Sequence, residues 1–387
     1  MDGGYFDIES CEIGVFRGLT ARTLDPADLR FAADVDRNVP VYSVDDLGAE
    51  LGDPARRGAL LAEWGRVLGA LSGVLVLRNA YRDTGVLDEA TAAYEHIIAR
   101  EKSAGGAKAD HFATAGANDR VWNALQKLCE ADPGLFARYF GNVAIAAVCE
   151  AWLGPFYQMT AQVNLVRPGG RAQEAHRDYH LGFQTAEVAG RFPAHSHDLS
   201  AVMTLQGAVA HCDMPVESGP TKLLPFSQLY RPGYMAYRRA DFRAHFEEHC
   251  IQLPLRKGDA VFFSPALFHA AGENRSADIH RMANLLQVSS AFGRAMESID
   301  REAVCRRLYP ALQSLIATGG VTHEEAEAAI AAAAEGYSFP TNLDSDPPVG
   351  GLAPETQAAL FRRALAVGMP AEEFEVELSR QTARRAA

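Results

Sequence analysis

Apolar residues recur at three- and four-residue spacing in several parts of the chain, and this spacing is typical of amphipathic helices. It predicts helices over 53–71, 88–101, 119–153, 322–336 and 355–367, with 355–367 as the last helix. Between them, a Gly- and Ala-rich segment (103–116) and a Pro- and Gly-rich segment (342–354) predict loops. The N-terminal third and the tail after Met296 are therefore expected to be mainly helical.

The pattern changes in the middle of the chain, where short runs rich in β-branched and apolar residues are divided by Gly, Pro and Asp. These runs predict strands over 159–166, 199–209, 260–263 and 283–288, and an earlier buried strand is predicted over 73–78. We therefore expect a mainly β core, an all-β barrel or sandwich, over 156–295. A mainly helical N-terminal region (1–155) is expected to pack on this core, and a helical C-terminal extension (296–387) to follow it.

Composition narrows the partners that the chain is expected to bind. The 387 residues carry a formal net charge of -12 with a pI near 5.5, which gives phosphate backbones and anionic lipids no general attraction. A small-molecule substrate is expected instead, with no nucleic-acid or membrane partner. The first residues lack a basic start and an apolar run, so no signal peptide is predicted. Six widely spaced cysteines without a CxxC pair predict reduced thiols and a cytoplasmic protein.

Three residues have the chemistry and the spacing of a metal site. His176 and Asp178 are two apart, so on an extended strand both side chains leave from the same face. About 90 residues later, His269 follows another predicted strand and suits the third position of a two-histidine, one-carboxylate facial triad. A His and an Asp two residues apart also occur by chance in many chains. For His269, the alternative is a histidine that is packed in the core and binds no metal.

The order of several motifs around these residues resembles the phytanoyl-CoA dioxygenase family. Members share a Gln-x-Asn strand, a Pro-Gly turn, an HxD motif, a Gly-Asp turn before the distal histidine and a downstream arginine. These elements stand here as Gln162–Asn164, Pro168–Gly169, His176–Asp178, Gly258–Asp259, His269 and Arg281. The resemblance covers about a third of the chain. It implies a double-stranded β-helix (a jelly roll, cupin-like), with Fe(II) bound by His176, Asp178 and His269.

The same resemblance implies 2-oxoglutarate as cosubstrate, together with O2. In the family, an arginine about eleven residues beyond the distal histidine forms a salt bridge with the far carboxylate of 2-oxoglutarate. His280 stands at that offset here, and Arg281 follows it. We assign Arg281, because the guanidinium grips a carboxylate with two parallel hydrogen bonds and the Arg-x-Ala sequence fits the family. Arg275 is the alternative.

Further candidates for cosubstrate binding are Gln162 and Asn164, which share one face of a strand, and Thr221. The alternative for the first two is a pair of solvent-facing polar residues. Beside the metal ligands, Arg177, Tyr179, His180 and Phe183 are weak candidates for substrate contact, and simple packing is as common a role for such residues. Family members carry Gly-Ser-His shortly after a glycine that precedes a strand, whereas this chain has Phe226-Ser227-Gln228. This difference weakens any inference of the substrate from other members of the family.

These observations predict an Fe(II)- and 2-oxoglutarate-dependent dioxygenase that hydroxylates or otherwise oxidises a small organic substrate and releases succinate and CO2. Related halogenases lack the carboxylate ligand, so an intact Asp178 favours hydroxylation, desaturation or ring chemistry. Two alternatives stay open: a cupin-like Zn or Mn enzyme that does not use 2-oxoglutarate, and a non-catalytic small-molecule-binding protein of the same fold. The helical extensions are expected either to cover the barrel mouth or to form a homodimer contact.

Overall fold

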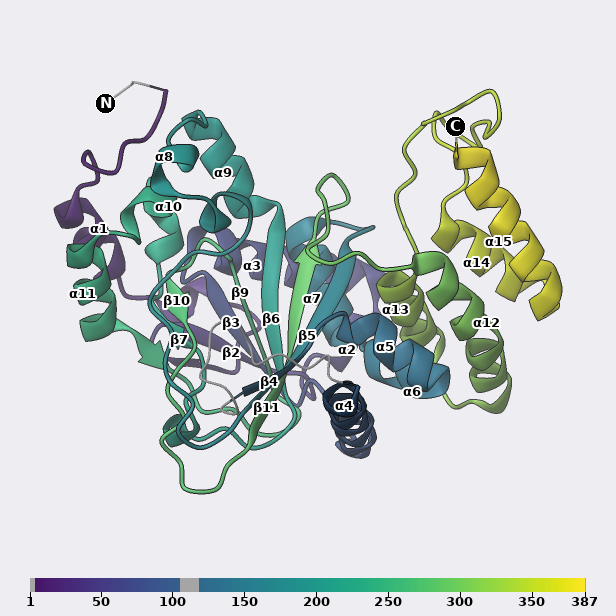
Figure 1. The fold of residues 1–387 in the computed structure, drawn as a ribbon, viewed down its shortest axis with the longest axis horizontal. Helices are drawn as coiled ribbons and strands as arrows, with labels where there is room; N and C mark the ends of the chain where they lie inside the picture. Colours follow the sequence, from purple (N-terminus) through teal and green to yellow (C-terminus); the bar gives the residue numbers. More distant parts are fainter. Residues whose placement is uncertain (1–3, 105–117, 387) are drawn as a thin grey trace.

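Two β-sheets form the centre of the computed structural model, which describes residues 4–104 and 118–386. Within these residues a mixed eight-stranded sheet has the order β1-β2-β3-β9-β6-β11-β5-β4, and a three-stranded sheet has the order β10-β7-β8 (Figure 1). The large sheet contains Asp34–Asp36 (β1), Val39–Ser43 (β2), Val74–Arg78 (β3), Asn118–Val121 (β4), Gln158–Val166 (β5), Thr204–Ala210 (β6), Ala260–Phe263 (β9) and Arg281–Ser289 (β11). The small sheet contains Lys222–Leu223 (β7), Ile251–Gln252 (β8) and His269–Ala270 (β10).

Strand β11 shows how alternation divides the large sheet into two faces. Its even-numbered residues Met282, Leu286 and Val288 join the main hydrophobic core. Its odd-numbered residues, among them Arg281 and Gln287, point to the other face and line a cavity. Strand β11 pairs antiparallel with both β5 and β6, so the polar residues that share its cavity face lie side by side across three strands.

Helices cover the face of the large sheet that is turned away from the cavity, and they bury it in the main core. Their bounds are Pro54–Ala70 (α3), Gly85–Ser103 (α4), Ala124–Ala131 (α5), Pro133–Phe140 (α6), Val143–Leu153 (α7), Arg301–Thr318 (α12), His323–Ala333 (α13), Gln357–Ala366 (α14) and Ala371–Arg385 (α15). Figure 1 shows α12, α14 and α15 together at the end of the molecule that carries the C-terminus. Among the described helices, none has both the length and the apolar character required to cross a lipid bilayer.

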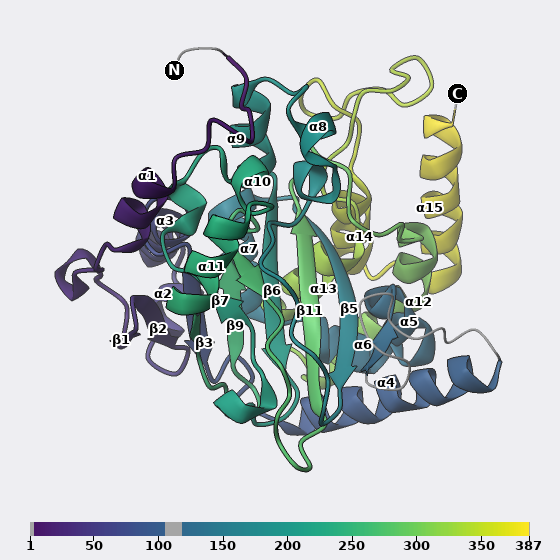
Figure 2. The same ribbon diagram turned by 60° about the vertical axis from the view of Figure 1, so that its left-hand side comes forward.

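The small sheet lies against the other face of the large sheet. A second apolar cluster, which includes Val76 and Val261 of the large sheet and Leu223 of the small one, packs between them. A third cluster covers the outer side of the small sheet with the helices Ile13–Thr20 (α1), Ala186–Ala189 (α8), Gly233–Ala236 (α10) and Ala240–His249 (α11). Figure 2 shows α10 and α11 in front of the sheets. The site therefore lies between two sheets that are each supported from outside by helices.

Most of the elements expected from the sequence are present, and three expectations were wrong in part. The range 119–153 begins with the polar edge strand β4, and its helices start only at Ala124. The range 199–209 opens within a helix, Ala194–Val202 (α9), before β6 begins at Thr204. The helix near 355–367 is followed by another, α15. Strands β1 and β2 in the N-terminal region were not expected, and the loop predicted over 103–116 falls mainly on residues outside those described.

Candidate metal centre and cavity

His176 and His269 are brought together by backbone pairing between two segments that are far apart in the sequence. The His176 N–H donates to the His269 carbonyl at 3.0 Å, and the His269 N–H donates to the His176 carbonyl at 3.2 Å. The Asp178 N–H donates to Pro265 O at 3.2 Å, which ties Asp178 to the turn that precedes His269. His176 and Asp178 therefore present their side chains on the face where His269 lies, as expected for residues two apart.

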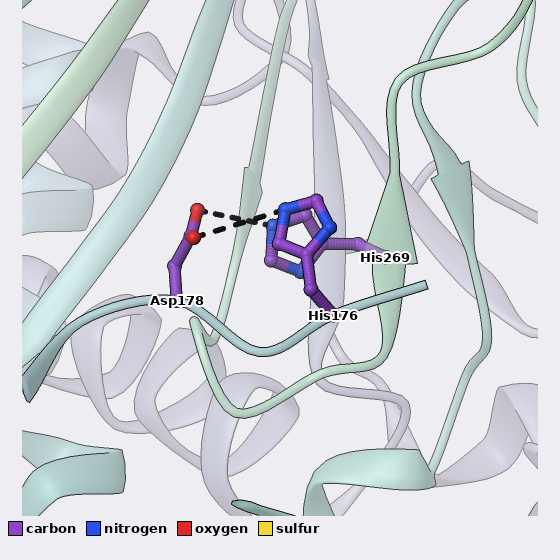
Figure 3. Close-up of side chains that lie close together, drawn as sticks. All are labelled: His176, Asp178 and His269. Atoms are coloured by element: carbon purple, nitrogen blue, oxygen red, sulfur yellow. Dashed lines mark hydrogen bonds and ion pairs between the residues drawn. The ribbon is translucent and has the colours of Figure 1, made fainter. Parts of the chain in front are cut away.

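Each histidine ring is oriented by a hydrogen bond to a backbone carbonyl two residues earlier. Nδ1 of His176 lies 2.8 Å from Glu174 O, and Nδ1 of His269 lies 2.8 Å from Leu267 O. Because a carbonyl can only accept, each Nδ1 carries the proton, and each Nε2 of the neutral ring carries a lone pair. Both Nε2 atoms face the Asp178 carboxylate (Figure 3), at 3.7 Å for His176 and 3.3 Å for His269.

This arrangement fits a single metal ion. Two cis ligand atoms that each lie about 2.1 Å from one ion are about 3 Å apart, and each histidine Nε2 lies near that spacing from one of the two Asp178 oxygens. The ligand atoms of all three residues lie within 4.8 Å of one another. Two neutral imidazoles and one carboxylate form the donor set of the facial triad, which leaves further coordination positions for exogenous ligands.

The protonation states of the three residues also suit metal binding. Burial alone would raise the pKa of Asp178, but the contact with the His269 imidazole, the neighbouring His176 ring and the Gln206 amide hold it well below its usual range. Burial, and next the neighbouring His269, lower the pKa of His176. The carboxylate is thus kept ionised and the His176 ring neutral, which are the forms that coordinate a cation.

The three side chains line a cavity of about 830 Å³ between the two sheets. Gln162, Asn164, Thr221, Tyr179, Phe183 and Arg281 line the same cavity, so it brings most of the predicted site residues together. Its apolar walls include Leu223 from the small sheet and Val261 and Phe263 from the large one. A cavity of this size is large enough for two small ligands side by side.

Arg281 is a buried cation in this cavity. Its residue is 7% exposed, and burial lowers the pKa of its guanidinium to about 10. Nη1 donates to the backbone carbonyls of Ser218 (3.2 Å) and Gly272 (3.4 Å), and no carboxylate of the described residues forms an ion pair with it. Arg275 and His280, in contrast, are exposed and lie outside the cavity lining. The chain thus places Arg281, not Arg275, where an anionic ligand could enter.

The polar candidates on β5 face the cavity and not the solvent. Gln162 is fully buried, and its Oε1 accepts a hydrogen bond from Arg120 Nη1 at 3.2 Å. Asn164 Oδ1 is buried and accepts no hydrogen bond from the described residues. Thr221 is partly exposed at the cavity wall.

Arg177, next to the ligands, belongs to the core. Its side chain leaves from the face opposite to His176 and Asp178, and Nη2 donates to Ser227 O (2.7 Å) and Tyr230 O (2.9 Å). The guanidinium also lies over the rings of Tyr234 and Phe268. Arg177 therefore supports the loop that carries the metal ligands from behind.

The other flanking residues differ from one another in position. Tyr179 is buried at the cavity with a positive φ of 64°, and its hydroxyl group has no hydrogen-bond partner among the described residues. Phe183 lines the cavity and is 54% exposed. His180 is exposed, lies outside the lining and contacts Ser200 Oγ through Nδ1 at 3.2 Å. Only Tyr179 and Phe183 of the four are thus placed to meet a substrate with their side chains.

Sequence reasoning missed several cavity residues. Gln206 on β6 donates to Asp178 Oδ2, and Trp122 and Met296 are exposed apolar side chains at the lining. Alternation along β6 could have placed Gln206 on the inner face, because it shares parity with Ala208 and Ala210. No local motif marks Trp122 or Met296, which come from segments distant from the ligands in the sequence.

Comparisons with known proteins agree with the motifs. The model of the phytanoyl-CoA dioxygenase family matches residues 70–283, more than half of the chain. A dioxygenase of Emericella variicolor, andF, is 27% identical over 139 residues, covering 35% of this chain and 43% of the relative. A dioxygenase of Talaromyces verruculosus, cdmD, is 26% identical over 156 residues, covering 39% and 46%. The matched region thus spans less than half the length of these curated relatives.

Among solved structures, a non-haem alpha-ketoglutarate-dependent carbocyclase from nogalamycin biosynthesis, SnoK, is similar at 21% identity and a TM-score of 0.43. The similarity covers 61% of this chain and 86% of that one.

Proposed function

Because the chain belongs to the phytanoyl-CoA dioxygenase family, we propose that it is an Fe(II)- and 2-oxoglutarate-dependent dioxygenase that oxidises a small organic substrate. His176, Asp178 and His269 would hold the iron. Arg281 would bind the far carboxylate of 2-oxoglutarate, and Gln162, Asn164 and Thr221 would border it. The products of the cosubstrate would be succinate and CO2.

The observation that carries this proposal is the presence of Arg281 and the three metal ligands in one cavity. Burying a cation is costly unless an anion meets it, and the described residues supply no carboxylate to Arg281. A dicarboxylate that spans from the metal to Arg281 would supply an anion to the guanidinium and further ligand atoms to the metal. The guanidinium would pair with one end of the molecule while the other end completes the metal coordination.

The bound iron and 2-oxoglutarate would supply the oxidation with O2, and the chain would supply binding and orientation. Asp178 as a third ligand supports hydroxylation, desaturation or ring chemistry over halogenation. The apolar walls would keep bulk water from the reacting carbon. Trp122, Phe183 and Met296, exposed at the lining, suit a substrate with a sizeable apolar surface.

The architecture also supports proposals about the fold, the assembly and the cellular compartment. We regard the strands of residues 156–295 in the two facing sheets as a double-stranded β-helix, to which the N-terminal region (1–155) adds β1 to β4 and a helical C-terminal extension (296–387) is attached. The C-terminal helices pack on the outer side of the large sheet, away from the cavity, so a homodimer contact suits them better than a cover over the mouth. Six free thiols suit a reducing compartment such as the cytoplasm.

A metal enzyme without 2-oxoglutarate, built on Zn or Mn, is the main competing function. It would use the same three ligands but has no use for a buried arginine beside them. A non-catalytic binding protein would have no need for an intact ligand set. Both alternatives leave Arg281 unexplained.

The deciding experiment is 2-oxoglutarate turnover by the purified protein with Fe(II), Zn(II) or Mn(II). We expect slow succinate formation with Fe(II) and O2 even before the true substrate is known, and none with Zn(II). The His269→Ala variant is the matched control for contaminating iron chemistry. If the iron-loaded protein neither binds 2-oxoglutarate nor releases succinate with any candidate substrate, the metal enzyme without cosubstrate becomes the better account.

A further inference from the structure

Gln206 is a buried amide in direct contact with the candidate metal ligand Asp178. It lies on β6, is 8% exposed, and donates a hydrogen bond from Nε2 to Asp178 Oδ2. An ionised carboxylate can only accept, so the amide must present its NH2 group to Asp178 and turn Oε1 away. The orientation of Gln206 is therefore fixed by chemistry, and Oε1 accepts no hydrogen bond from the described residues.

The two oxygens of Asp178 have different surroundings. Oδ2 receives the Gln206 amide and lies 3.3 Å from His269 Nε2. Oδ1 lies 3.7 Å from His176 Nε2 and receives no hydrogen bond from the described residues. A carboxylate with one oxygen tied in this way has less freedom to rotate both oxygens toward a metal ion.

We propose that Gln206 is a positioning residue that holds Asp178 Oδ2, so that the carboxylate binds the metal through Oδ1 alone. This inference rests on the proposed function, because single-oxygen binding matters when other ligands need the remaining positions. With two histidines and one carboxylate oxygen, three of six positions stay open for 2-oxoglutarate and O2. A two-oxygen carboxylate would occupy one of those three.

The chain offers a matched control in Gln287. It lies directly opposite Gln206 in the β11–β6 register, is also 8% exposed, and also has an Oε1 without a partner among the described residues. In the described part of the chain, Gln287 forms no hydrogen bond with Asp178. The two glutamines thus share side chain, burial and wall of the cavity, and they differ in the contact with the metal ligand.

The test compares Gln206→Leu, Gln206→Glu and Gln287→Leu with the wild type in anaerobic titrations. Co(II), followed by its visible absorption, reports the metal site alone, and Fe(II) with 2-oxoglutarate reports the chelate. Loss of a partner that orients a metal ligand typically costs 10- to 100-fold in metal affinity, so we expect about that rise in the Co(II) dissociation constant of Gln206→Leu. Gln206→Glu keeps the length but cannot donate when ionised, so it should lose at least as much.

Gln287→Leu should stay within about twofold of the wild type in the Co(II) titration, and the Co(II) spectrum should change in the Gln206 variants alone. Thermal unfolding checks that each variant folds, and Gln206→Glu replaces Gln206→Leu if the leucine variant does not. Unchanged spectra and affinities in the Gln206 variants would overturn the proposal. Equal losses at Gln206 and Gln287 would also overturn it, because the effect would then come from the polarity of the wall.

These titrations distinguish failure of the proposed function from failure of the positioning role of Gln206. If the wild type binds Co(II) but never 2-oxoglutarate, the proposed function fails, and the Co(II) spectra of the Gln206 variants still decide whether Gln206 positions Asp178.

Discussion

Arg281→Lys is the substitution that best separates a cosubstrate role from a structural one. Arg281 uses Nη1 for the carbonyls of Ser218 and Gly272, which leaves Nε and Nη2 without a partner among the described residues. These two atoms form the fork that grips a carboxylate with parallel hydrogen bonds. A lysine at this position keeps the charge but loses that geometry.

The expected cost follows from the contacts that would be lost. A hydrogen bond to a charged group contributes about 1.5–3 kcal/mol, and replacing the fork by an ammonium group removes about one such bond. The 2-oxoglutarate dissociation constant should therefore rise about ten- to hundred-fold. Arg275→Lys is the control, because Arg275 is exposed and lies outside the cavity lining, so the 2-oxoglutarate dissociation constant of this variant should equal that of the wild type.

Anaerobic calorimetric titration of 2-oxoglutarate into the metal-loaded variants measures both constants directly. A large loss for Arg275→Lys with none for Arg281→Lys would mean that the one-residue insertion assumed before Arg281 is wrong. An unchanged 2-oxoglutarate dissociation constant in both variants would refute the 2-oxoglutarate proposal itself.

Three further predictions concern other parts of the molecule. The His269→Ala variant should fold but lose iron-dependent succinate formation, and full activity at limiting iron would contradict the ligand assignment. A Cβ on Gly233 would lie 1.9 Å from Arg177 Cζ, so Gly233→Ala should lower the free energy of unfolding by about 1–3 kcal/mol, whereas Gly14→Ala, with open space around it, should not destabilise the protein. Burial, with a nearby lysine, lowers the pKa of His211 to about 3. Because the unfolded chain takes up this proton near pH 6.5, the stability from neutral His211 is complete above that pH and decreases as the pH falls toward 3. The free energy of unfolding, measured with denaturant, should therefore decrease by about 2 kcal/mol between pH 7.5 and pH 5 because of His211. An equal decrease in the His211→Gln variant would contradict the assignment.

The parts of the fold that could be predicted are those where alternation or helical spacing is unbroken. Strands β5, β9 and β11 carry an apolar face toward the main core, and their residues gave the strand ranges closely. Strand β4 could not be found in this way, because Asn118–Val121 is short and polar and pairs only at the sheet edge. Helix α9 was mistaken for strand because Leu199 and Val202 are apolar yet exposed.

The candidate site was predictable where chemistry and spacing act within one segment. The common face of His176 and Asp178 follows from strand geometry, and the same geometry places Arg177 on the opposite side, in the core. The contact between Gln206 and Asp178 depends on how distant segments meet, so no local pattern contains it. The exposed side chain of Phe183 at the cavity likewise depends on the surrounding loops.

Anaerobic addition of 2-oxoglutarate to the Fe(II)-loaded protein tests the central claim most directly, because the iron chelate of 2-oxoglutarate has a weak visible charge-transfer band. We expect the band to appear, to saturate at one 2-oxoglutarate per chain, and to be absent from the His269→Ala variant. Stoichiometric iron binding by the wild type without any such band at saturating 2-oxoglutarate would contradict the account.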